Sequence, residues 1–156
     1  DLLPSCWCNL GLLALGEGDG AQAGRWLERL RGEPDPQHLA CFLRAPVAIA
    51  AGQWEEARRA VSEALAHRSP MEALPLAALY LAAQGQAERA VELYALARTS
   101  PCVARSRWHE EVFGQRIAQA AANLPPEAIR AAQERGRARD WLVTVEELRA
   151  ERAEGE

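Results

Sequence analysis

An amphipathic pattern recurs along the first two thirds of the chain, with a glycine at its centre. On both sides of each glycine, apolar residues return at the three- and four-residue spacing of an α-helix. The central glycines are Gly18, Gly52 and Gly85, in steps of 34 and 33 residues. A glycine between two helices supplies a left-handed cap that other residues resist. The pattern therefore predicts three helix pairs, over the segments 7–36, 41–70 and 74–101.

Residues of matching character also recur at fixed distances from each glycine. Small residues stand seven before and five after it, and the positions nine and twelve after it are apolar as well. Small residues let two helices approach closely, and larger ones fill the space between one pair and the next. A single pair cannot bury its own apolar face, so we expect the pairs to stack. The four columns are Gly11, Ala45 and Ala78; Ala23, Ala57 and Ala90; Leu27, Val61 and Tyr94; Leu30, Ala64 and Ala97.

The period blurs after Pro101, where we expect shorter helices that cap the stack. Gly114 occupies a small-residue position in the first of them. Pro125-Pro126 at the start and Gly136 at the end delimit the second, and Asp140 is the expected N-cap of the third. The polar tail 153–156 is expected to fray. The predicted helices cover 105–123, about 124–135 and about 140–152.

Prolines punctuate the repeats. Pro46 falls inside the first helix of the second repeat, where it removes a backbone hydrogen bond and predicts a kink. Four more prolines follow a second helix and are expected to stop it and turn the chain, namely Pro34, Pro36, Pro70 and Pro101.

The composition favours helical structure and argues against nucleic-acid binding and membrane insertion. Hydrophobic residues make up 49% of the 156 residues but aromatic residues only 6%, so Ala and Leu, both strong helix formers, dominate. The net charge of −4 argues against direct nucleic-acid binding. No apolar run approaches the roughly 20 residues of a membrane span, and no signal peptide is present, so we expect a cytoplasmic protein without membrane contact. Because the chain opens with Asp1, we expect it to be part of a longer protein.

Candidate catalytic and metal motifs have simpler interpretations. The glycine-rich segment 16–20 lacks the Gly-Lys-Ser/Thr of a phosphate loop and falls where the repeat needs a turn. Cys6 and Cys8 are two apart on a helix and point to different faces, and no histidine stands at ligand spacing from them. We expect the cysteines to be reduced thiols, buried or half-buried. The sequence predicts no enzyme, no cofactor and no metal site.

A basic cluster stands near the C-terminus, formed by Arg135, Arg137 and Arg139. In an acidic chain such a cluster is typical of a solvated turn. A docking contact to an acidic neighbouring module is the alternative.

The columns resemble the tetratricopeptide repeat. The first repeat matches with Trp7, Leu10, Gly11, Ala23 and Leu27, and the second carries the closely similar turn Gly52-Gln53-Trp54-Glu55-Glu56-Ala57. The resemblance implies one helical-repeat domain over 1–156 that forms a right-handed superhelix. Its parts would be repeats at about 4–37, 38–70 and 71–103, a degenerate cap at 104–152 and the tail 153–156.

The ending LPPEAIRAAQERGRARDWLVTVEELRAE, residues 124–151, resembles the C-terminus of bacterial signal-transduction ATPases of the STAND class. In that comparison Gly136-Arg137-Ala138 would form a turn and 144–148 part of a final short helix. The resemblance implies that the chain is the sensor end of such a regulator, downstream of a nucleotide-binding module.

The tetratricopeptide resemblance also implies a binding surface, because the first helix of each unit lines a concave groove. The alternative is that the apolar members of this set are core between packed helices. The implied groove residues are Ser5, Cys8, Leu12, Leu15, Leu39, Phe42, Ile49, Glu72, Leu79, Ala82, Trp108, Glu111 and Gln115.

We therefore predict a sensor or protein-interaction domain. It would bind a peptide, a protein or a small ligand, or the nucleotide-binding module of its own polypeptide. The alternative from another class is a self-assembling scaffold without a separate ligand.

Overall fold

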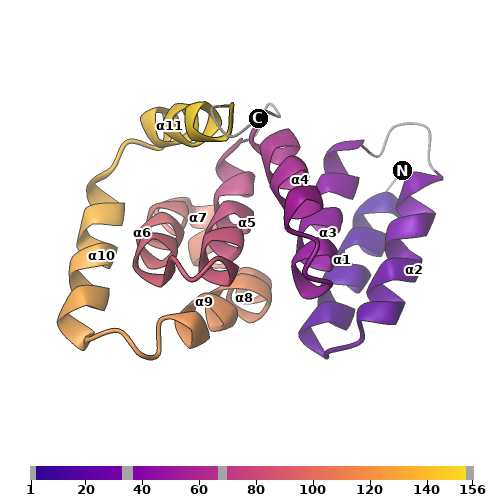
Figure 1. Cartoon of the computed structure of the whole chain (residues 1–156), viewed down its shortest axis with the longest axis horizontal. Helices are drawn as coiled ribbons and strands as arrows, with labels where there is room; N and C mark the ends of the chain where they lie inside the picture. Colours follow the sequence, from indigo (N-terminus) through magenta and orange to yellow (C-terminus); the bar gives the residue numbers. More distant parts are fainter. Residues whose placement is uncertain (1–2, 33–36, 67–69, 154–156) are drawn as a thin grey trace. The chain divides into compact units, whose positions relative to one another are not determined.

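The computed structural model describes residues 3–32, 37–66 and 70–153, with side chains for 3–32, 40–66 and 73–151. Over these ranges the chain is helical and has no strand (Figure 1). The all-α prediction is therefore confirmed. The chain forms two compact units, Asp1–His67 and Arg68–Glu156, and each is considered by itself.

The first unit consists of two helix pairs. Helix α3 contacts both α1 and α2, so the second pair packs on the first. Pro46 lies inside α3, as the sequence predicts, and its side chain is fully buried. The four helices are α1 (Leu3–Gly16), α2 (Gly20–Arg31), α3 (Gln37–Ala50) and α4 (Trp54–Ala66) (Figure 1).

The turn inside each predicted pair has the same backbone structure in all three repeats. Gly18, Gly52 and Gly85 have φ values of +82°, +69° and +77°. Each glycine N–H donates to the carbonyl three residues earlier, and the following N–H donates to the carbonyl five residues earlier, at 2.8 to 3.2 Å. This is the Schellman motif, in which a left-handed glycine satisfies the last carbonyls of a helix. The predicted left-handed caps are confirmed.

The predicted columns lie in the cores of their units. All twelve residues of the four columns are buried. Gly11 shows why one column must be small, because a Cβ there would lie only 2.5 Å from Leu43 Cδ2. Tyr94 shows how a larger residue is used, since its hydroxyl reaches the His109 carbonyl at 3.2 Å. Side-chain size thus matches the space at each position.

The second unit contains the third pair, followed by shorter helices. Helix α6 packs against α5 on one side and α10 on another, and α9 contacts both α5 and α6. The helices are α5 (Pro70–Ala83), α6 (Ala87–Ala97), α7 (Pro101–Ala104), α8 (Arg107–His109), the π-helical turn η1 (Glu110–Gly114), α9 (Gln115–Ala120), α10 (Pro126–Ala138) and α11 (Trp141–Ala153) (Figure 1).

The single helix predicted over 105–123 is wrong in its bounds. A short helix, α7, precedes it, and Ser106 begins the next one by accepting a hydrogen bond from the His109 N–H at 3.2 Å. From there the chain stays helical to Ala120, through the π-helical turn. Pro101 stands in the first turn of α7, where a missing N–H costs nothing, so it starts a helix as well as following one.

Gly136 does not end α10 as the sequence predicts. The helix continues to Ala138, and Gly136 is buried against α6. A Cβ at this position would overlap the Glu92 carbonyl oxygen and lie 2.9 Å from Ala95 Cβ. The glycine is therefore needed for close approach of two helices and not for a turn. The other two predicted termini are confirmed: Pro126 stands in the first turn of α10, and Asp140 Oδ1 accepts from the Val143 N–H at 3.0 Å.

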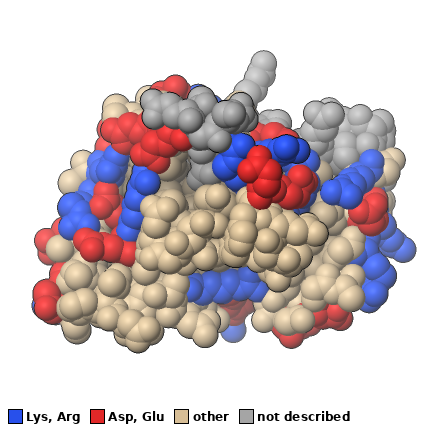
Figure 2. Space-filling model, viewed as in Figure 1, with Lys and Arg blue, Asp and Glu red and all other residues tan. Residues whose placement is uncertain are grey.

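The basic cluster is not a turn, because Arg135 and Arg137 lie within α10, and two of its arginines bind carboxylates of the same unit. Arg135 contacts Glu88 at 2.7 Å and Glu92 at 2.9 Å. Arg139 contacts Glu92 at 2.8 Å and also pairs with Glu147 of α11. Acidic and basic side chains accordingly alternate over the edge of this unit that carries α10 (Figure 2). These pairs and the Gly136 contact hold α10 on α6.

Candidate functional site

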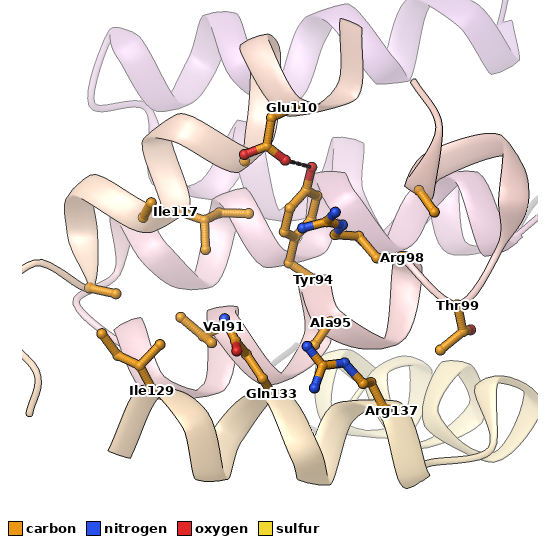
Figure 3. Close-up of a pocket in the computed structure, with 14 residues that line it drawn as sticks. Val91, Tyr94, Ala95, Arg98, Thr99, Glu110, Ile117, Ile129, Gln133 and Arg137 are labelled. Atoms are coloured by element: carbon orange, nitrogen blue, oxygen red, sulfur yellow. Dashed lines mark hydrogen bonds between the residues drawn. The ribbon is translucent and has the colours of Figure 1, made fainter. Parts of the chain in front are cut away.

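A cavity of about 430 Å³ lies within the second unit, between α6, the segment from α7 to α9, and α10 (Figure 3). Residues of two helices supply half of its lining. Residues of α6 and its C-cap contribute at spacings of three and four, and residues of α10 at a spacing of four, so each set occupies one helix face. The α6 set is Val91, Tyr94, Ala95 and Arg98, and the α10 set is Ile129, Gln133 and Arg137.

The cavity has an apolar end and a basic end. Val91, Ile117 and Ile129 gather on one side in Figure 3, whereas Arg98 and Arg137 lie on the other. Val91 and Ile117 are buried and Ile129 is half-buried, while both arginines are exposed. The arrangement is that of an apolar cleft with guanidinium groups at its mouth.

The two arginines at the mouth, Arg98 and Arg137, lack among the described residues the carboxylate partners that Arg135 and Arg139 have. Arg135 and Arg139 lie on the flank of α10 that faces Glu88, Glu92 and Glu147. Arg137 lies on the flank that faces the cavity. In the ranges that the structure describes, no hydrogen bond or ion pair is formed by the side chain of Arg137 or of Arg98. The two guanidinium groups at the cavity therefore form no ion pair with a carboxylate in the described part of the unit.

Glu110 is the one acidic residue among the described residues of the lining, and it is directed toward Tyr94 (Figure 3). The Tyr94 hydroxyl lies 3.3 Å from Glu110 Oε2. Burial, together with the nearby Glu110 charge, raises the pKa of Tyr94 to about 12, so the hydroxyl stays protonated and donates. Gly114 makes room for this contact, because a Cβ there would lie 2.6 Å from the Glu110 carboxyl. Glu110 is exposed, and its carboxylate lies beside the Tyr94 hydroxyl.

The implied groove residues are in varied environments. Five of them are buried in their units: Cys8, Leu12, Leu15, Leu79 and Ala82. Three are exposed, namely Ser5, Glu111 and Gln115, and three are half-buried, namely Phe42, Ile49 and Trp108. The side chains of Leu39 and Glu72 lie outside the described residues. The five buried side chains are core, so a ligand could reach them only by displacing their neighbours.

The described groove residues of the second unit do not line the cavity. Trp108 packs edge-on against His109 and Phe113, with ring centroids 4.8 and 5.8 Å away. Glu111 pairs with Arg107 at 2.7 Å. The cavity is thus a different site from the implied groove.

None of the four cysteines forms a disulfide, and they lie in two kinds of environment. Cys6 and Cys102 are exposed, whereas Cys8 and Cys41 are buried. Burial raises the pKa of Cys8 to about 12 and that of Cys41 to about 11, so neither is a nucleophile at neutral pH. The prediction of burial thus holds for two of the four. Among the described residues, no three His, Cys, Asp or Glu side chains come together as metal ligands.

Sequence reasoning missed the cavity because its wall joins helices that are far apart in the chain. The four-residue spacing of Ile129, Gln133 and Arg137 is visible in the sequence, but nothing local shows that this helix face turns toward α6.

Across the described ranges, no helix is both long and apolar enough to cross a bilayer. Comparison with protein-family models, curated proteins and solved structures finds no match to this chain.

Proposed function

We propose that this chain is a ligand-binding helical-repeat domain of the tetratricopeptide type, with the cavity of its second unit as a binding site. The observation that carries the proposal is an apolar cavity whose mouth holds two arginines without a partner among the described residues. Its volume of about 430 Å³ falls within the roughly 300–1,000 Å³ of small-molecule sites. A few directed polar groups in an apolar wall are also typical of such sites.

The chemistry of the lining supports binding over catalysis. Among its described residues, the wall contains no cysteine, histidine or aspartate, and its one glutamate is directed toward Tyr94. The Thr99 hydroxyl donates to the Leu96 carbonyl at 2.7 Å. The side chains left facing the cavity are aliphatic groups, an amide and two guanidinium groups, which bind and orient a ligand.

The repeat type is supported by the three turns. The same Schellman hydrogen bonds recur at Gly18, Gly52 and Gly85, and the same columns are buried around them. The placement in a STAND-type regulator remains a proposal that rests on the resemblance of the ending. The Gly136-Arg137-Ala138 part of that resemblance is helical and not a turn. A gene that encodes no nucleotide-binding motif before Asp1 would refute this placement.

The binding function is tested with Nile red, an uncharged dye whose fluorescence rises in apolar sites. Ala118 lines the cavity from α9 and is exposed, so Ala118→Phe should fill the cavity without disturbing the core. Ala120 is an exposed alanine of the same helix that does not line the cavity, so Ala120→Phe is the matched control. We expect Ala118→Phe to weaken dye binding at least tenfold and Ala120→Phe to leave it unchanged. Equal binding by both variants would refute the site.

A self-assembling scaffold is the second candidate, and one observation favours it. Leu10 and Leu13 of α1 are 43% and 42% exposed. One repeat later, Val47 takes the position of Leu13 and is half-buried, in a helix that α1 and α2 contact. A second copy of the chain could cover α1 in a similar way. Light scattering over a concentration series should then show an oligomer that Leu10→Glu with Leu13→Glu dissociates, whereas a monomer at all concentrations would exclude it.

A further inference from the structure

We propose that the cavity of the second unit binds an aliphatic monoanion, a molecule with an alkyl body and a single carboxylate. The alkyl body would lie on Val91, Ile117 and Ile129, and the carboxylate at the mouth between Arg98 and Arg137 (Figure 3). This inference rests on the proposed binding function and names the chemical class of its ligand.

The sign of the ligand's charge follows from the arginines. A guanidinium group presents a planar set of donors that matches a carboxylate, and such charge-assisted pairs are stronger than neutral hydrogen bonds. Two other arginines of this unit are paired in this way, since Arg135 and Arg139 each bind two glutamates. Arg98 and Arg137 have no such carboxylate among the described residues, so an anionic ligand would supply it.

The number of charges follows from Glu110. The described lining holds two arginines and one glutamate, so a single negative charge balances it. A second charge on the ligand would be repelled by the Glu110 carboxylate, which lies 3.3 Å from the Tyr94 hydroxyl. The geometry therefore favours a carboxylate over a doubly charged phosphate.

The body of the ligand follows from the wall and its size. The apolar end is built from branched aliphatic side chains and alanines, and Tyr94 is the one aromatic ring in the described lining. An alkyl chain suits such a wall because burial of apolar surface has no directional requirement. The volume of about 430 Å³ gives room for the alkyl chain of a medium-chain acid.

The experiment compares octanoate, 1-octanol and octylamine by isothermal titration calorimetry on the full chain. The three share an alkyl chain and differ in charge. We expect octanoate to bind at least tenfold more tightly than octanol, and octylamine more weakly than either. Octyl phosphate should bind less tightly than octanoate at a pH where it is doubly charged.

Arg98→Gln and Arg137→Gln should each remove most of the preference for octanoate over octanol. Arg130 is an exposed arginine of α10 that does not line the cavity, so Arg130→Gln should keep the preference. Circular dichroism would confirm that all three variants are folded.

The outcomes separate this inference from the proposed function. Equal binding of octanoate and octanol, or tighter binding of octyl phosphate, would overturn the monoanion inference. The binding function would stand in that case if Ala118→Phe still weakens the binding of Nile red. A chain that binds neither Nile red nor octanoate would overturn both.

Discussion

Replacing Gly136 by alanine should weaken the packing of α10 on α6. A Cβ at this position would lie 2.9 Å from Ala95 Cβ and would overlap the Glu92 carbonyl oxygen. Carbon atoms rest at about 3.5–4.0 Å, so the helices must separate by at least about 0.6 Å. The atom in the way is backbone, which cannot rotate aside as a flexible side chain would.

The expected loss is about 2 kcal/mol of local stability. Overpacking of this kind costs about 1–3 kcal/mol, and the separation also weakens the ion pairs of Glu92. The better helix propensity of alanine returns at most about 1 kcal/mol. Hydrogen exchange of the α10 amides, followed by mass spectrometry, should therefore show about 30-fold lower protection. Octanoate and Nile red binding should fall with it, because α10 carries one wall of the cavity.

Gly24 provides the opposite control. It lies inside α2, and a Cβ added there would meet no atom within 4 Å beyond its own helix and chain neighbours. Gly24→Ala should therefore stabilise the first unit by about 0.5–1 kcal/mol. If Gly136→Ala leaves α10 protected as in the wild type, the close approach of α10 to α6 is refuted.

Three further changes test other parts of the structure. Gly52→Ala should destabilise the first unit by about 1 kcal/mol in urea unfolding, because alanine resists a φ of +69°; an unchanged midpoint would contradict the left-handed turn. Burial alone would raise the pKa of Glu92, but hydrogen bonds from two arginines lower this pKa overall. The contribution of Glu92 to the free energy of unfolding is therefore present above about pH 4.5 and is lost as the pH falls through the pKa of the folded state. The wild type should thus exceed Glu92→Gln in unfolding free energy by about 1 kcal/mol at pH 7, and a gap that persists at pH 2 would argue against the carboxylate as its source. A disulfide reagent at pH 8 should modify the exposed Cys6 and Cys102 quickly. It should modify Cys8 and Cys41 only after denaturation, because burial raises the pKa of Cys8 to about 12 and that of Cys41 to about 11.

The repeat was readable from the sequence because its determinants are local. A glycine with positive φ is needed wherever one helix must end and the next begin at once, and residues seven before or five after it reach the core by helix geometry alone. Gly18, Gly52 and Gly85, with their columns, could therefore be predicted position by position. The caps at Pro126 and Asp140 were predictable for the same reason, since each acts on its own first turn.

The cavity and the role of the C-terminal arginines depended on contacts between distant segments. Gly136 looks like a helix stop in sequence, and only the nearness of Glu92, 44 positions earlier, shows that it is a site of close packing. Arg135, Arg137 and Arg139 form one basic cluster in sequence, yet packing of α10 on α6 gives two of them carboxylate partners and directs the third to the cavity. Helix periodicity and turn chemistry thus determined the pairs and their turns. Only the tertiary structure decided which helix faces pack together, as α10 does on α6. This pairing depends on the shape and charge of two segments that lie far apart in the sequence.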